Sequence, residues 1–163
     1  MKLYITLIFG ILFLFTGIVI CPFLGFTDER PDFLIILCVY VIVYNNNERS
    51  IVIQAWLIGL LKDSMTSDPF GLHSLLFTTL SYIMLKLKYT IHLTNTFVLI
   101  VLVVFYTFQY HLLHSMIIYV VCYVDLADNV LKSVTYTAFI TPIIIPILRI
   151  FTHERPEGYL QEV

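Results

Sequence analysis

The sequence predicts an all-α polytopic integral membrane protein with six transmembrane helices. Hydrophobic residues make up 60% of the 163 residues, charged residues make up 12%, and the mean hydropathy is +0.93, which is the composition of a membrane-spanning chain. Apolar runs separated by short polar turns account for almost the whole sequence. Since the length suits one domain, we expect a single transmembrane domain over residues 1–163.

The first three spans are expected at about 3–24, 31–44 and 50–63. The first is long enough to cross about 30 Å of hydrocarbon, and we interpret it as uncleaved because no small-residue cleavage site follows it. The second opens with Pro31 in its first turn and Asp32 beside it, at the positive end of the helix dipole. Spans two and three are short, and the alternative is that they form a re-entrant pair.

The last three spans are expected at about 69–86, 95–124 and 131–151. Asp68 and Pro69 suit the N-cap and the first position of the fourth helix. A basic turn and an acidic turn separate the remaining spans.

The distribution of lysine and arginine predicts that both termini are cytoplasmic, because cytoplasmic loops carry the excess of basic residues. Six spans place both ends on one side of the membrane. The basic residues on that side are Lys2, Arg49, Lys86, Lys88, Arg149 and Arg155, against Arg30, Lys62 and Lys132 on the other; the acids expected outside are Asp28, Glu29, Asp32, Asp63, Asp68, Asp125 and Asp128.

Composition and spacing also exclude several kinds of function. The net charge of −2 and the lack of a basic cluster argue against binding of nucleic acid. Cys21, Cys38 and Cys122 have neither the spacing of a zinc site nor that of a disulfide framework. We therefore expect no cofactor, no metal and no catalytic residues.

Two histidines in the fifth span are the best candidates for chemistry. His111 and His114 are three residues apart and would share a helical face, but no H-E-x-x-H motif accompanies them. We expect them to face the bundle interior and form hydrogen bonds there, because polar groups in lipid must be paired. The alternative is a role as metal ligands or as a proton relay.

The segment from Gly59 to Gly71 breaks the hydrophobic pattern most informatively. Asp63 lies near the C-terminal end of a helix, where the macrodipole opposes it, and near hydrocarbon, where an unpaired charge is costly. Lys62 is adjacent and points to a different face, so we expect a donor from another helix or a partner chain to hold Asp63. Gly59 would allow close approach of a helix. The alternative is that both charges are solvated among the lipid headgroups.

These motifs, in their order and spacing, resemble the MreD family of bacterial rod shape-determining proteins. Arg30-Pro31-Asp32 opens the second span, Gly59-Leu60-Leu61-Lys62-Asp63 closes the third, and Phe70-Gly71-Leu72 opens the fourth. The family's typical length, its hydrophobicity and its six spans also match, so the resemblance covers essentially the whole chain.

The resemblance implies a non-enzymatic inner-membrane scaffold of the cell-elongation machinery, which controls cell shape and peptidoglycan synthesis. Its implied partner is MreC, a single-span periplasmic scaffold, and more distantly RodA, a class B penicillin-binding transpeptidase and MreB. It also implies a relation in fold to the S-components of vitamin transporters. The matching residues, assigned to helix packing and partner docking, are Pro31, Asp32, Gly59, Asp63, Gly71 and Leu72.

The alternative function is that of an S-component-like subunit that binds a small molecule such as a vitamin. Its ligand would lie in an outward-facing cavity under the turn from Ser64 to Asp68. Such subunits dock through an Ala-x-x-x-Ala pattern on the first span, and this chain has no alanine there.

Overall fold

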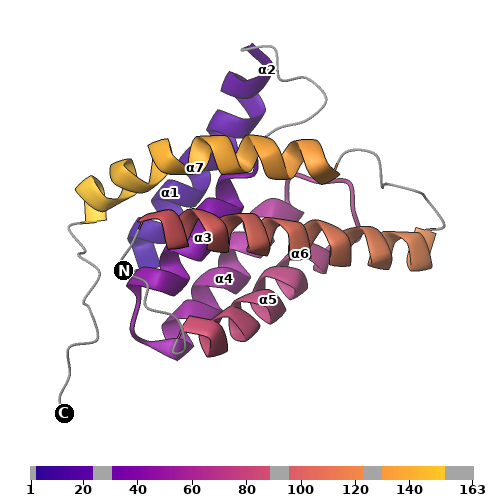
Figure 1. Ribbon diagram of the computed structural model, residues 1–163. Helices are drawn as coiled ribbons and strands as arrows, with labels where there is room; N and C mark the ends of the chain where they lie inside the picture. The colour runs from indigo at the N-terminus through magenta and orange to yellow at the C-terminus, as the bar shows by residue number, and fades with distance from the viewer. Residues whose placement is uncertain (1–2, 24–30, 89–95, 123–129, 153–163) are drawn as a thin grey trace.

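Every regular element in the described part of the chain is a helix, which confirms the all-α prediction (Figure 1). The computed structural model describes residues 3–23, 31–88, 96–122 and 130–152. Its elements are α1 (Leu3–Phe15), the π-helical η1 (Thr16–Ile20), α2 (Cys21–Phe23), α3 (Phe33–Tyr44), α4 (Glu48–Asp63), α5 (Leu72–Lys88), α6 (Thr96–Cys122) and α7 (Val130–Thr152).

Within the described residues, three helical stretches are long and apolar enough to cross a membrane, namely Leu3–Phe23, Phe97–Val121 and Leu131–Thr152. Phe33–Tyr44 is apolar but shorter, and α4 and α5 carry more polar residues. Six spans therefore stay a prediction. Several charges that underlie the predicted orientation lie outside the described residues: Lys2, Asp28, Glu29, Arg30, Asp125, Asp128 and Arg155.

Helix α3 forms the centre of the bundle. All twelve of its residues are buried, and α1, α4, α5, α6 and α7 all pack against it. Its sequence is apolar on every face, which is the pattern of a helix enclosed by protein or lipid rather than one at a water-facing surface. A short apolar helix is thus placed where its neighbours cover it completely.

The helix ends gather at two opposite ends of the bundle. The start of α3, the end of α4 and the start of α5 lie together near the later part of α6, and we call this the acidic end after Asp32, Asp63 and Asp68. The end of α3 and the end of α7 meet at the other side, where α5 also ends. We call it the basic end after Lys88 and Arg149.

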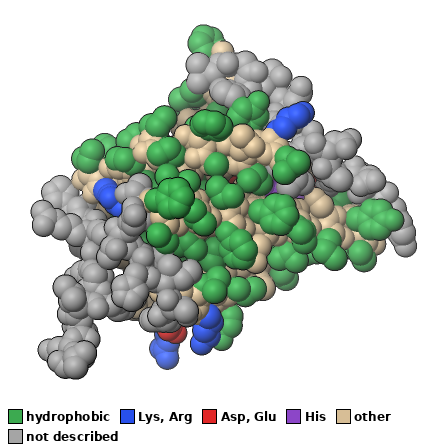
Figure 2. Space-filling model, in the orientation of Figure 1, with side chains coloured by type: hydrophobic (Ala, Val, Ile, Leu, Met, Phe, Trp, Pro, Cys, Tyr) green, Lys and Arg blue, Asp and Glu red, His purple; other side chains and the backbone are tan. Residues whose placement is uncertain are grey.

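The exterior is largely apolar. Large hydrophobic side chains are exposed along α1, α6 and α7, and they cover much of the face seen in Figure 2, where basic side chains lie at the margins. Figure 1 shows the α1–α2 end projecting beyond the other helices. Such a surface suits contact with lipid or with another apolar helix.

Candidate functional site: a polar cluster at the acidic end

The first contact of the cluster is an ion pair between Lys62 of α4 and Asp32 at the start of α3. The Lys62 ammonium donates to Asp32 Oδ2, and both side chains are largely buried. Asp32 is the N-cap of α3, where its Oδ1 accepts from the Ile35 N–H at 3.4 Å, and its own N–H donates to Thr137 Oγ1 of α7 at 3.1 Å. One aspartate therefore joins three helices.

The same lysine also contacts aromatic rings. Its ammonium lies 4.3 Å from the ring centroid of Tyr110 on α6 and 5.8 Å from that of Phe77 on α5. The negative face of an aromatic ring attracts a cation, and more strongly away from water. The Lys62 side chain thereby links α4 to α5 and α6.

Asp63 is the cap of the following helix. Its two carboxylate oxygens accept from the backbone N–H groups of His73 at 2.9 Å and Ser74 at 3.0 Å. These donors belong to the first turn of α5, where backbone N–H groups have no partner within the helix and the dipole favours an anion. Asp63 is 4% exposed, so it is not solvated.

The start of this helix differs from the sequence-based expectation. The prediction placed Asp68 as N-cap and Pro69 as first helical residue, whereas α5 begins at Leu72. The physical reason is that Gly71, with φ of +94°, interrupts the helical conformation directly before Leu72, while Asp63 from the preceding helix accepts from the first-turn N–H groups. Pro31 was also predicted in the first turn of its helix, but it lies buried before α3, because Asp32 is the N-cap and the helix begins at Phe33.

Gly59 lies at the closest approach of α4 to α5. A Cβ on Gly59 would lie 2.3 Å from Ser74 Cα and 2.8 Å from Ser74 N, so only glycine permits this backbone contact. Gly71 has φ of +94° immediately before α5, a conformation that glycine adopts at low cost. Leu72 follows it and packs, partly buried, against the core.

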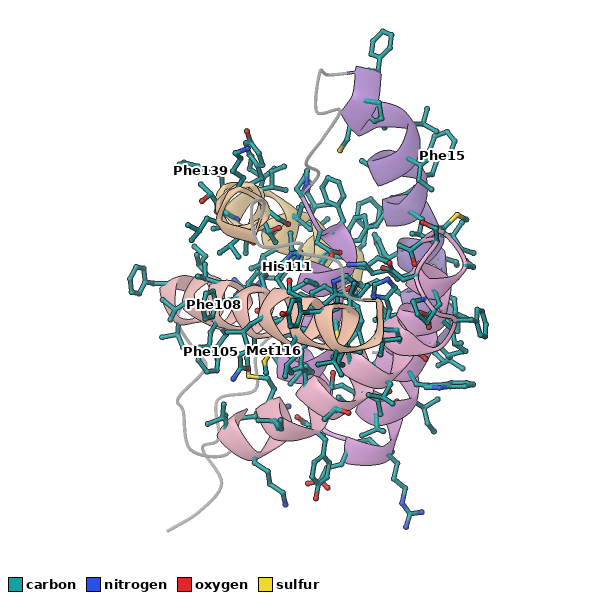
Figure 3. The ribbon with its side chains drawn as sticks, turned by 90° about the vertical axis from the view of Figure 1, so that its right-hand side faces the viewer. Phe15, Phe105, Phe108, His111, Met116 and Phe139 are labelled. Carbon is teal, nitrogen blue, oxygen red and sulfur yellow. The ribbon has the colours of Figure 1, made fainter. Side chains whose placement is uncertain are left out.

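The histidines divide between two sets of partners. His111 Nε2 lies 2.9 Å from Ser133 Oγ of α7, and Figure 3 places it on the inner side of α6, opposite Phe105. His114 Nε2 instead lies 3.0 Å from Asp68 Oδ2. Both face the interior and meet hydrogen-bonding partners, as expected, but they do not act on a common partner.

Sequence reasoning identified Asp32, Gly59 and Asp63 but missed what brings them together. Lys62 and Tyr110 are central to the cluster, and neither was assigned to it. The available signal was that Lys62 and Asp63 point to different faces of α4. That separation requires two distinct partners, and the structure supplies Asp32 for the first and the α5 N–H groups for the second.

We call the contacts of Asp32, Lys62, Asp63 and Tyr110 the clamp, because together they hold several helices in place. Charges that would be costly near hydrocarbon are paired with each other, with ring faces or with free N–H groups at a helix start. The cluster thus fixes the relative positions of α3, α4, α5, α6 and α7.

A family model described as rod shape-determining protein MreD matches residues 1–154 of the chain. No curated protein and no solved structure matches it.

Proposed function

Because the chain belongs to the MreD family and is thus a rod shape-determining membrane protein, we propose that it is a non-enzymatic scaffold subunit of the cell-elongation complex. Its direct partner is MreC, and RodA, a class B penicillin-binding transpeptidase and MreB associate more distantly. It resides in the bacterial cytoplasmic membrane as one domain of six spans, with both termini cytoplasmic. Through MreC it controls cell shape and peptidoglycan synthesis.

The observation that supports this proposal most strongly is that the charged side chains of Lys62 and Asp63 at the acidic end have their partners inside the bundle. Lys62 forms an ion pair with Asp32, and Asp63 accepts hydrogen bonds from backbone N–H groups at the start of α5. Partner binding then depends on the exposed apolar surface, while the cluster keeps the helices that carry that surface in place. Leucine and phenylalanine side chains of a partner's membrane helix would pack there through dispersion and close fit.

The residues singled out from the sequence take the supporting role in this proposal. They shape the bundle, and the bundle presents the docking surface. These residues are Pro31, Asp32, Gly59, Asp63, Gly71 and Leu72.

A photo-crosslinking experiment tests the proposal. A photoreactive phenylalanine analogue would replace Phe15 on α1, Phe105 on α6 or Phe139 on α7, side chains that are 59%, 43% and 74% exposed and that point outward in Figure 3. We expect a crosslink to MreC from at least one position in intact cells, together with copurification of MreC. The absence of both would contradict the proposal.

Cysteine accessibility tests the topology separately. Asn46 lies in the turn between α3 and α4, which six spans place on the cytoplasmic side. A cysteine at this position should react only after the membrane is permeabilised. Labelling of intact spheroplasts would favour the re-entrant arrangement and would leave the proposed partner untouched.

The alternative of a vitamin-binding transporter subunit gains no support from the family match. Members of the family are structural proteins of cell shape. We therefore retain the scaffold as the proposed function.

A further inference from the structure

Three side chains at the acidic end converge in a way that the clamp does not require. Asp68 lies in the turn after α4, His73 in the first turn of α5, and His114 on α6. Their ligand atoms all lie within 4.8 Å of one another. Both histidine Nε2 atoms face the same carboxylate oxygen, Asp68 Oδ2, from 3.1 Å and 3.0 Å.

In this arrangement, His73 Nε2 is buried without a hydrogen-bond partner among the described residues. The side chain is 2% exposed, and Nε2 has no hydrogen-bond partner of acceptable geometry even though Asp68 Oδ2 is near. If Nε2 carries a proton, that buried donor is unsatisfied. If it does not, its lone pair has no donor and lies beside the oxygen of an anion, 3.1 Å away. A bound cation resolves both cases: it displaces any proton on Nε2 into solvent and then accepts the lone pairs of the nitrogen and of the carboxylate oxygen together.

The other nitrogen of His73 is held as in known metal sites. Nδ1 lies 2.7 Å from the Tyr110 hydroxyl, so a Nδ1–H can donate to that oxygen and leave Nε2 free to bind a metal. Histidines that bind metals nearly always donate their second N–H to a carboxylate, a backbone carbonyl or a water, which fixes the ring and its tautomer. The Tyr110 hydroxyl oxygen takes that place here. The position of Tyr110 is set in turn by the Lys62 ammonium above its ring.

We propose that Asp68, His73 and His114 form a binding site for one divalent transition-metal ion of the zinc type. Two imidazoles and one carboxylate are a common ligand set for zinc, and three protein ligands leave a fourth tetrahedral position for water. Ligand atoms on one tetrahedral zinc ion are about 3.3 Å apart, close to the two distances to Asp68 Oδ2.

The local charge also favours a cation. The charged side chains that these contacts bring together are three carboxylates, Asp32, Asp63 and Asp68, and one ammonium, Lys62. With neutral histidines this set has an excess of negative charge, which a divalent ion offsets. The metal would tie the α4–α5 turn to α5 and α6, and would thereby extend the clamp to a segment that it otherwise leaves out.

Metal titration of the purified full chain in detergent, after chelator treatment, tests the site. Zinc affinity is measured by competition with a chromophoric chelator, and cobalt(II) reports geometry through its visible absorption. We expect one tight equivalent of zinc and a tetrahedral cobalt spectrum. His114→Gln and Asp68→Asn, at partly exposed positions, should each weaken zinc binding by at least about 100-fold, since a ligand is lost.

Two further variants separate the site from general histidine binding. Tyr110→Phe should weaken zinc binding by about 10-fold, because it removes the hydroxyl that holds His73 Nδ1 but none of the three ligands. His111→Gln, one turn from His114 and bound to Ser133, should bind zinc like the unmodified chain. His92 and His153, outside the described residues, are present in every variant, so weak binding there cancels in the comparison.

Several results would overturn the proposal. They are failure of the unmodified chain to bind zinc, equal zinc affinity in the His114→Gln, Asp68→Asn and unmodified proteins, or an equal loss in His111→Gln. Helix content by circular dichroism and a single size-exclusion peak confirm that each variant is folded. None of these measurements depends on MreC, so failure of the metal site and failure of the proposed function can be told apart.

Discussion

The two ends of the bundle stabilise buried charge by different means. At the acidic end, Lys62 meets the carboxylate of Asp32 and Asp63 meets two N–H groups of α5. At the basic end, Lys88 Nζ donates to the Asn45 carbonyl oxygen at 2.6 Å, and Arg149 Nε donates to the Tyr44 hydroxyl at 2.6 Å.

The two ends differ in the group that is left without a partner when one member of a contact is removed. At the acidic end the remaining partner is a buried ion or a pair of buried donors, and both are costly. At the basic end the acceptors are neutral, and long basic side chains at a helix end can extend to water. The acidic end should therefore be the more sensitive to substitution, and the following variants test that ranking.

One of the two largest losses is expected for Lys62→Met, which leaves Asp32 charged and unpaired. Removing one partner of a buried ion pair typically costs about 3–5 kcal/mol. Unfolding of the detergent-solubilised protein measures the change. Lys86→Met is the matched control, because Lys86 is exposed on α5 and should cost less than about 0.5 kcal/mol. Equal losses of unfolding free energy in the two variants would show that the buried ion pair contributes no more than an exposed lysine.

Asp63→Ala should cost about 2–6 kcal/mol, since it leaves the N–H groups of His73 and Ser74 without acceptors at about 1–3 kcal/mol for each buried donor. Asp63→Asn keeps one acceptor oxygen and should lose roughly half as much. The same unfolding experiment applies, and copurification of MreC should fall in parallel with stability. Unchanged stability with lost MreC binding would instead assign Asp63 to direct docking.

Gly59→Ala should destabilise the bundle by about 1–3 kcal/mol, the usual cost of overpacking, because the new methyl group would collide with the α5 backbone at Ser74. Gly17→Ala is its control. A Cβ at Gly17 would make only an ordinary contact, 3.9 Å from Phe33. Thermal unfolding of the two variants side by side measures the difference, and a similar loss in both would indicate a general effect of replacing glycine.

The smallest effect is expected at the opposite end, for Asn47→Ala. Asn47 caps α4 through one bond of 3.4 Å from the Ser50 N–H, and losing such a cap costs about 0.5–1 kcal/mol. Urea-dependent unfolding compared with that of Asp63→Ala measures both caps on one scale. If Asn47→Ala proves as costly as Asp63→Ala, the two ends do not differ as argued.

The sequence was informative where local chemistry decides the outcome. The all-helical class followed from composition, and the alternation of apolar runs and polar turns located helices close to their observed bounds. The requirement that another helix hold Asp63 followed from its position at a helix end. The predicted start of α5 was wrong, because its capping residue lies ten positions upstream on another helix, where local sequence patterns do not reveal it.

The pairings within the cluster depend on the three-dimensional arrangement. Asp32 and Lys62 are thirty positions apart, and Asp68 and His114 are forty-six apart. Periodicity places His111 and His114 on neighbouring parts of one face but cannot say that one meets α7 and the other meets the α4–α5 turn. That distinction depends on where other helices cross α6.

The complete enclosure of α3 has a consequence for how the chain is made. A helix of 12 residues is about 18 Å long, less than the roughly 30 Å of a bilayer core. Its covering includes α6 and α7, which are synthesised after α3, α4 and α5. Until α6 and α7 have been made, part of the α3 surface that they cover in the finished protein is not covered by them. We therefore expect chains truncated before α7 to be substrates for membrane proteases.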